Sequence, residues 1–351
     1  MGRRVLITGL GTYWGGRLAQ RIERDPEVDV IIGLDTQEPK VRLERTEYVR
    51  SDENYSILSR IVAATKVDTI VHTFLVVDST QTSGRRLHEI NVIGTMNLCA
   101  AASKAGSTVR KVVVKSSALV YGTTPKDPVW FTETTPRRNP PATRIERSLV
   151  EVESYVRDFA IDNPHVEVTL LRFSNVLGPD LPTPFSRALR LPVVPSVLGF
   201  DPRFQLVHVE DVVRSLLFCI DEGRAGIYNV AGDGLLPWSE IAALCGKVTV
   251  PLPFWGTNLA AEPLRRIGVD IPPELLQLLR YGRGLDNRRL KAEGFRYRYT
   301  TAGAVEAFVE ATRPRDTVGG RDPDYRYEED VEQFFRHSPA VVREVGDDVK
   351  G

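Results

Sequence analysis

Cysteine is scarce in this chain of 351 residues, which contains only Cys99, Cys219 and Cys245. Their number is odd and no two of them form a Cys-x-x-Cys pair, so we expect neither a disulfide framework nor a zinc site. The histidines show no metal-ligand spacing with one another or with the cysteines, so we predict no metal. Few, scattered thiols are typical of a reducing compartment, and we expect a cytoplasmic protein.

Long apolar runs and an excess of either charge are also missing. No run reaches the ~18 residues that cross a bilayer, and the first residues, Met-Gly-Arg-Arg, lead into a strand rather than into the apolar core of a signal peptide. Lys and Arg together number 46, as do Asp and Glu. This balance excludes the bulk electrostatic footprint of a nucleic-acid or anionic-membrane binder. We therefore expect partners that are neither nucleic acids nor membranes.

The first 175 residues alternate between two hydrophobic periodicities. Segments with helical spacing lie between short runs rich in β-branched residues, and these runs are 5–8, 28–34, 69–73, 111–116 and 166–172. Strands that alternate with helices indicate βαβ units, and near-continuous apolar strands fit a sheet that is covered on both faces. The sequence therefore predicts an α/β protein with a Rossmann-type, doubly wound parallel sheet.

A glycine-rich loop follows the first predicted strand and reads Thr-Gly-Leu-Gly-Thr-Tyr-Trp-Gly-Gly over residues 8–16. A dinucleotide site needs small residues here because the chain turns tightly and a pyrophosphate approaches the helix N-terminus. Asp35 ends the second strand, twenty residues after Gly15. Its carboxylate can accept both adenosine ribose hydroxyls and would repel a 2′-phosphate, so we predict NAD rather than NADP. A tight strand–helix turn without a cofactor is the alternative.

A series of further motifs follows in a fixed order: Asp52, His72, and the segments 91–95, 116–122, 171–179 and 207–212. Together with the glycine loop, this series resembles the extended short-chain dehydrogenase/reductases, the NAD-dependent epimerase/dehydratase group that acts on nucleotide sugars. The resemblance spans roughly residues 3–310. It implies bound NAD and cofactor contacts from Gly9, Gly11, Thr12, Tyr13, Trp14, Gly15, Asp35, Asp52, His72 and Asn91. Thr12 departs from the family because it occupies the position of the middle glycine.

The amino-acid composition of the chain changes after the fifth predicted strand. Residues 178–199 are rich in proline, which favours loops with one short helix around 185–191. We predict an NAD-binding Rossmann domain over 1–175, completed by about 205–232, a substrate-binding lobe from 176–204 and 233–312, and a polar C-terminal extension over 313–351.

A catalytic serine is recognisable, whereas the tyrosine and lysine of the family are not. In the family a Ser or Thr orients the substrate oxygen and a Tyr exchanges the proton. A Lys four residues after the Tyr lowers the phenol pKa and anchors the nicotinamide ribose. Ser117 matches the serine, although a hydroxyl that only caps the strand end would look the same in the sequence.

Two registers relate the following helix to the family, in which a Glu follows the Lys by four residues. With Glu151 as this Glu, Thr143 occupies the Tyr position and Arg147 the Lys position, where Arg147 could still hold the cofactor ribose. With Glu153, both positions are aliphatic. We adopt the first register, which makes Thr143 and Arg147 the candidate catalytic residues. A threonine hydroxyl carries protons poorly, so we expect an altered proton relay.

Candidate substrate contacts lie further along the chain. The resemblance places Asn175 beside the diphosphate or sugar, with a structural turn as the alternative. Arg203 lies one residue before a position at which the family often carries a phosphate-binding Arg, so we take it as a second substrate contact. Arg283, Asp286 and Arg289 could also bind an anion, although a surface helix is the commoner fate of such residues. Lys115 is expected to face solvent or to form a salt bridge.

The function and the assembly are predicted in outline. The first hypothesis is an NAD-dependent epimerase/dehydratase-like oxidoreductase acting on a nucleotide sugar or a related hydroxyl compound. The second is a non-catalytic NAD-binding sensor or scaffold, and a purely structural subunit also stays open. We predict a homodimer because the helices around 86–105 and 144–160 match the dimer helices of the family. The second helix has an apolar stripe that needs a cover, formed by Leu149, Val152, Val156 and Phe159.

Overall fold

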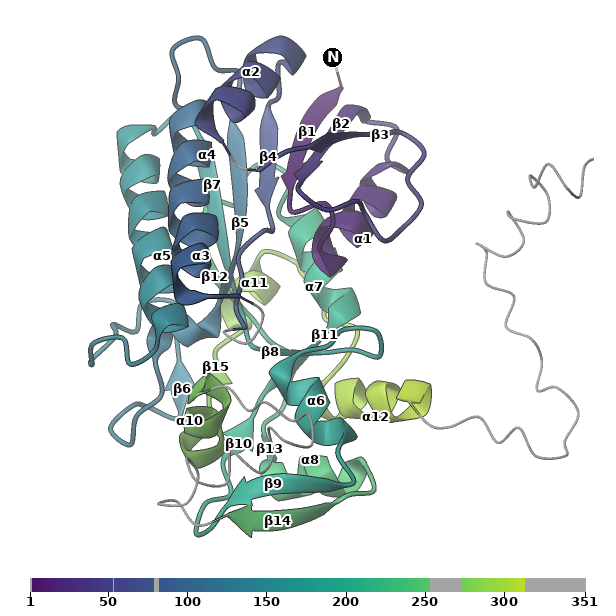
Figure 1. Ribbon diagram of the computed structural model, residues 1–351, viewed down its shortest axis with the longest axis vertical. Helices are drawn as coiled ribbons and strands as arrows, with labels where there is room; N and C mark the ends of the chain where they lie inside the picture. Colours follow the sequence, from purple (N-terminus) through teal and green to yellow (C-terminus); the bar gives the residue numbers. More distant parts are fainter. Residues whose placement is uncertain (1, 53, 79–81, 253–272, 313–351) are drawn as a thin grey trace, which may run out of the picture. The chain divides into compact units, whose positions relative to one another are not determined.

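A parallel sheet runs through the protein, as the alternation of strands and helices predicts. In the computed structural model (Figure 1) it has seven strands in the order β12-β7-β5-β4-β1-β2-β3. The structure describes residues 2–52, 54–78, 82–252 and 273–312. The strands of the sheet are β1 (Arg3–Thr8), β2 (Val28–Asp35), β3 (Thr46–Arg50), β4 (Thr69–His72), β5 (Lys111–Ser117), β7 (Glu167–Phe173) and β12 (Gly226–Val230).

The strand order reverses beside β1. Strands β2 and β3 extend the sheet on one side of β1, and β4, β5, β7 and β12 extend it on the other, with every neighbouring pair parallel. The predicted Rossmann-type fold is confirmed. Strand β3 was not predicted, because none of its residues is buried and its apolar pattern is correspondingly weak. In a doubly wound sheet, ligands bind beyond the C-terminal strand ends at such a reversal.

Helices cover both faces of the sheet (Figure 1). One apolar core joins the sheet to α1 (Tyr13–Ile22), α7 (Val209–Phe218) and α11 (Arg288–Ala292). The core on the other face takes in α2 (Tyr55–Thr65), α3 (Gly84–His88), α4 (Gly94–Ala102) and α5 (Arg144–Asp162). A short π-helix, η1 (Glu89–Ile93), joins α3 to α4. Burial on both faces explains why the central strands are almost continuously apolar.

Helix α5 buries its apolar stripe against the sheet of its own chain. The exposed fractions of Leu149, Val152, Val156 and Phe159 are 0, 0, 2 and 6%. All four belong to the same core as strands β4 and β5. The stripe therefore has its cover within the chain, and the argument that it requires a dimer partner no longer holds.

A second lobe has its own apolar core around Phe185, Phe204 and Trp238, whose rings pack edge to face. Its helices are α6 (Pro184–Arg190), α8 (Trp238–Leu244), α10 (Pro273–Tyr281) and α12 (Thr301–Thr312). Short strand pairs complete it: β8 (Asn175–Leu177) with β11 (Leu206–His208), β9 (Val193–Val197) with β14 (Val248–Leu252), β10 (Arg203–Phe204) with β13 (Leu236–Pro237), and β6 (Trp130–Phe131) with β15 (Gly284–Leu285). The predicted extension over 313–351 lies outside the described residues.

A buried ion pair ties α5 to strand β7 of the sheet. The Arg172 guanidinium on β7 donates to both carboxylate oxygens of Glu153 on α5, at 2.5–3.2 Å. Glu153 also accepts a hydrogen bond of 2.8 Å from Ser116, and Arg172 donates one of 2.8 Å to the Tyr121 hydroxyl. That hydroxyl donates in turn to Asn229 on β12. The network sets the position of α5 relative to the ends of β5 and β7.

We expect the substitution Arg172→Met to lower the free energy of unfolding by about 3–5 kcal/mol, because it leaves the buried Glu153 carboxylate without its cation. The double variant Arg172→Met/Glu153→Leu should recover much of this loss. Urea denaturation of the variants measures both effects. The exposed pair Arg85–Glu89 is the control, since Glu89→Gln should change stability by only ~0.5 kcal/mol or less. Equal effects at the two pairs would contradict the assignment.

Candidate functional site

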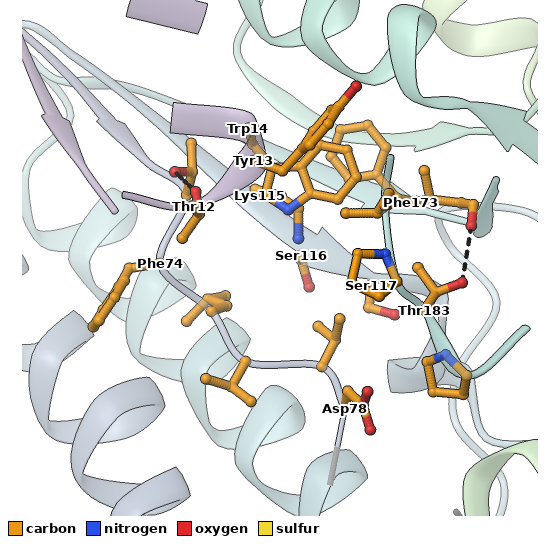
Figure 2. Close-up of a pocket in the computed structure, with 18 of the residues that line it drawn as sticks. Thr12, Tyr13, Trp14, Phe74, Asp78, Lys115, Ser116, Ser117, Phe173 and Thr183 are labelled. Atoms are coloured by element: carbon orange, nitrogen blue, oxygen red, sulfur yellow. Dashed lines mark hydrogen bonds between the residues drawn. The ribbon is translucent and has the colours of Figure 1, made fainter. Parts of the chain in front are cut away.

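A cavity of about 750 Å³ opens at the C-terminal ends of β1, β4, β5 and β7 (Figure 2). Its walls come from the loop after β1, the end of β2 and the segments 73–78, 115–118, 173–176 and 180–185. The second lobe adds Glu274, Leu275, Leu278, Arg283 and Leu285. The cavity lies at the reversal of the strand order and receives side chains from both lobes, which is where a doubly wound fold binds its ligands.

The glycine loop forms the tight turn that its sequence predicts. Gly9 has a φ of +79°, and a Cβ there would lie 2.9 Å from the backbone of Phe74. A Cβ on Gly15 would lie 2.1 Å from the carbonyl oxygen of Gly9, and one on Gly11 would lie 2.7 Å from that of Gln37. Only glycine fits these three positions, and the chain can therefore pass directly into the first turn of α1.

Thr12 compensates for the missing middle glycine by capping α1. Its φ is −72°, so this position does not need glycine. The Thr12 hydroxyl accepts a hydrogen bond of 3.1 Å from the Gly15 N–H and donates one of 2.6 Å to the Gly9 carbonyl. The helix N-terminus is intact beside Tyr13 and Trp14, which line the cavity. The departure from the family pattern thus preserves the end of the helix that favours a phosphate.

Asp35 lies at the end of β2 and lines the same cavity, as predicted. Its side chain is only 4% exposed. One carboxylate oxygen accepts a hydrogen bond of 2.9 Å from the Gly11 N–H, and the other accepts one of 3.0 Å from the Gln37 N–H. These bonds hold the negative charge beside the glycine loop. The glycine loop at the start of α1 fits the pyrophosphate of NAD, and the Asp35 carboxylate fits its adenosine ribose.

Three other predicted cofactor residues lie outside the cavity lining. His72 is fully buried between the Thr8 and Thr95 hydroxyls, at 2.6 and 3.1 Å from its ring nitrogens. Asn91 is buried in η1, and its side-chain amide exchanges two hydrogen bonds of 2.8 and 2.9 Å with the backbone of Val76. Asn91 thus holds the lining segment 73–78 in place from behind. Asp52 is exposed, and its predicted cofactor contact stays a prediction.

The candidate catalytic residues lie in two separate places in the structure. Ser117 lines the cavity, and its hydroxyl also accepts a hydrogen bond of 3.3 Å from the Leu119 N–H. Thr143 instead caps the N-terminus of α5 by accepting from the Glu146 N–H, and Arg147 is exposed in a separate surface hollow. Neither Thr143 nor Arg147 lines the cavity, so the structure gives no support to their assigned catalytic roles.

Burial favours the second register of α5 relative to the family, in which Glu153 and not Glu151 is the reference glutamate. Glu153 is the buried partner of Arg172, whereas the Glu151 side chain is 38% exposed. With Glu153 as the reference, the Tyr and Lys positions of the family are Ile145 and Leu149, both with 0% exposure. Spacing alone cannot choose between two glutamates two residues apart, because only the tertiary contact marks one of them.

The substrate side of the cavity contains Asn175 but not Arg203, which is exposed on β10. Arg283 lines the cavity instead and is 8% exposed. Its guanidinium donates to the Gly122 carbonyl and the Thr123 hydroxyl. Among the described residues its Nε has no partner, nor does the buried hydroxyl of Ser174, which also lines the cavity.

Lys115 corrects a second expectation of the sequence analysis. Its side chain is 3% exposed and lines the cavity, with Nζ 5.1 Å from the centre of the Trp14 ring. Burial lowers the pKa of this amine to about 8. Within the part of the chain that the structure describes, Lys115 forms no ion pair. The signal in the sequence was a lysine in a buried strand, two residues before Ser117 and therefore on the same face.

The described residues contain no group of three or more His, Cys, Asp or Glu side chains that could hold a metal ion. In the same ranges, no helix combines the length and the apolar character that a membrane span requires.

The sequence matches the NAD dependent epimerase/dehydratase family over residues 5–231. The chain belongs to this family. An uncharacterized protein of Mycobacterium tuberculosis is 36% identical over 327 residues, which cover 91% of this chain and 86% of that protein. The family resemblance noted in the sequence is confirmed, and NAD is the cofactor of this family, as Asp35 predicts.

Solved structures share the fold of this family member. The UDP-glucose 4-epimerase of Thermotoga maritima, solved with UDP-glucose, has a TM-score of 0.68 at 19% identity, over 88% of this chain and 98% of that one. WbmG of Bordetella bronchiseptica, solved with NAD and UDP, has a TM-score of 0.65 at 20% identity, over 89% and 94% of the two chains. At this level of identity the likeness establishes the architecture alone.

We expect the protein to bind NAD at least about tenfold more tightly than NADP, a difference of about 1.4 kcal/mol, because Asp35 repels a 2′-phosphate. Asp35→Asn should narrow this gap while keeping the size of the side chain. Isothermal titration calorimetry with both dinucleotides measures it. Asp52→Ala, tested in parallel, shows whether the exposed Asp52 contributes to NAD affinity at all. Tighter binding of NADP by the unsubstituted protein would contradict the assignment.

Proposed function

We propose that this protein is an NAD-dependent oxidoreductase that transfers a hydride to and from a nucleotide sugar or a related hydroxyl compound. The observation that carries the proposal is one continuous cavity. It brings the glycine loop and Asp35 together with Ser117, Asn175 and Arg283. A cofactor half and a substrate half in one continuous cavity are what hydride transfer between two bound molecules requires.

The cofactor half is built from this chain's own backbone and one carboxylate. The N–H groups at the start of α1 would hold the pyrophosphate, and Asp35 would accept the adenosine ribose hydroxyls. When bound, NAD supplies the acceptor or donor of the hydride. The tight turn at Gly9 and Gly15 supports this use, because neither glycine adds a side chain at the end of the helix.

The substrate half suits an anionic, hydroxyl-rich molecule. Arg283 carries a buried positive charge with an unused N–H, and Ser174 carries an unused hydroxyl, so both gain a partner when a diphosphate or sugar enters. Ser117 and Asn175 add two further polar groups. The UDP-glucose bound by the Thermotoga maritima protein and the UDP bound by the Bordetella bronchiseptica protein support the same substrate class.

The replacement of the family's Tyr and Lys by Ile145 and Leu149 favours a second candidate function. Without a phenol on α5, the protein would bind NAD and a ligand as a sensor or scaffold and would not turn over. The two candidates predict the same affinities but different rates, so turnover separates them.

We further propose a homodimer, and the proposal rests on residues other than the buried apolar stripe of α5. Ile93 in η1 and Met96 in α4 are 42% and 36% exposed, and α4 lies beside α5 on the outer face of the sheet. Two large apolar side chains on this helical face favour contact with a second copy.

We expect Ser117→Ala to lower hydride transfer with nucleotide sugars by at least about tenfold and to leave NAD affinity nearly unchanged, because its hydroxyl orients the substrate. Nicotinamide absorbance in steady-state assays gives the rate. Thr143→Ala and Arg147→Ala are matched controls that should retain activity, since both residues lie outside the cavity. Firm NAD binding without turnover of any hydroxyl substrate would favour the sensor function instead.

Sedimentation velocity at micromolar concentration tests the dimer. We expect a dimer for the natural chain and a shift toward monomer for Met96→Glu, because a charge would be buried at the contact. Val248→Glu is the control, as Val248 is 72% exposed in the second lobe. A natural chain that sediments only as monomer would refute the assembly.

A further inference from the structure

We propose that Lys115 is a catalytic residue that accepts and returns the substrate hydroxyl proton at its Nζ atom, in place of the tyrosine that the family carries on α5. This inference rests on the proposed oxidoreductase function and names the group that makes its proton transfer possible.

The geometry of β5 presents Lys115 and Ser117 to the same cavity. The two residues are two positions apart on a strand, so their side chains leave the same face of the sheet. Both line the cavity, and Figure 2 shows Lys115 extending among Trp14, Ser116 and Ser117. A hydroxyl oriented by Ser117 would therefore meet the Lys115 amine rather than a side chain from α5.

The surroundings of Lys115 provide no counter-ion for its amine among the described residues. Four carboxylates share the cavity, Asp35, Asp78, Asp180 and Glu274, as do the cations Arg17, Lys40, Arg86 and Arg283. Within the described ranges none of the four carboxylates forms an ion pair with Lys115. Its polar contact is with the face of the Trp14 ring at 5.1 Å. A buried lysine without a carboxylate counter-ion releases its proton more readily than an exposed one, which suits a group that must exchange a proton.

Other phenols of the chain are less suited to this task. The Tyr121 hydroxyl is buried in the network below the cavity, where it donates to Asn229 and accepts from Arg172. Tyr13 lines the cavity, but Figure 2 shows its hydroxyl directed away from Ser117. Burial also raises the pKa of Tyr13 above the ordinary value for a phenol, whereas it lowers the pKa of Lys115 to about 8. Burial thus moves the pKa of Lys115 toward neutral pH and the pKa of Tyr13 away from it.

The proton step balances with the hydride step. The neutral Lys115 amine takes the hydroxyl proton and becomes an ammonium ion. The hydrogen on the same carbon leaves with its two electrons as a hydride to NAD⁺, which gives a carbonyl compound and NADH. Reduction runs in reverse, with the ammonium returning its proton to the oxygen. No further oxidant, base or metal is needed.

Two substitutions at Lys115 separate proton transfer from charge. Lys115→Met keeps the length and burial of the side chain and removes the amine. We expect it to lower hydride transfer by 10²–10⁴-fold, the usual contribution of general acid–base catalysis, and to change NAD affinity by no more than about threefold. Lys115→Arg keeps the charge but cannot release a proton, so it should be about as inactive. Lys111→Met is the matched control, because Lys111 is buried in the same strand but pairs with Glu167 outside the cavity.

A second readout needs neither cofactor nor turnover. Acylation of the natural protein at a series of pH values, followed by mass spectrometry of the peptide containing Lys115, gives the midpoint at which its amine becomes reactive. We expect a midpoint near pH 8, against about 10.4 for exposed lysines.

The outcomes divide clearly between the two proposals. Turnover by the natural protein that persists in Lys115→Met or Lys115→Arg, or a labelling midpoint near 10, overturns the role of Lys115 and leaves the proposed function standing. Absence of turnover in the natural protein, with NAD bound, overturns both. Loss of turnover in both Lys115 variants, with retained NAD binding and a low midpoint, is the result that we expect.

Discussion

The ion pair between Arg172 and Glu153 fixes the part of the molecule on which the cavity depends. It joins strand β7 to α5 through a bidentate contact in which both side chains are almost completely buried. Separating these charges would strand one of them in a medium of low dielectric constant, so the helix and the strand have to keep one register. Ser116 and Tyr121 are hydrogen-bonded to the same pair, which holds the residues on both sides of Ser117.

The cofactor half of the cavity depends on backbone rather than on side chains. Close packing at Gly9 and Gly15 shapes the turn, the Thr12 hydroxyl caps the helix, and Asn91 clamps the opposite wall through the Val76 backbone. The π-helix around Asn91 is the local distortion that accompanies this clamp, as π-helical turns often do at functional sites. Contacts within the chain thus define the shape of this half of the cavity, which lowers the cost of ordering it on binding.

The polar groups around Ser117 come from different elements than those of the family. In the register set by Glu153, helix α5 contributes aliphatic residues to the core at the positions where the family carries Tyr and Lys. Strand β5 contributes a buried lysine to the cavity, which we propose as the proton carrier. A positive charge and a titratable group thus remain near Ser117, although they now belong to one side chain.

The sequence by itself determined the parallel sheet, the glycine turn and the acidic end of β2, and with them the expectation of NAD as the cofactor. These features follow from local patterns, since hydrophobic period, backbone space and a carboxylate at a strand end all act over a few residues. The tertiary structure alone decided that Glu153 rather than Glu151 pairs with Arg172, that Arg283 rather than Arg203 reaches the cavity, and that Lys115 is buried in it. Each of these outcomes depends on which side chains meet across elements far apart in the chain. A lysine or glutamate reads the same in sequence whether it meets solvent or a buried partner, and only the packing of the two lobes distinguishes the two environments.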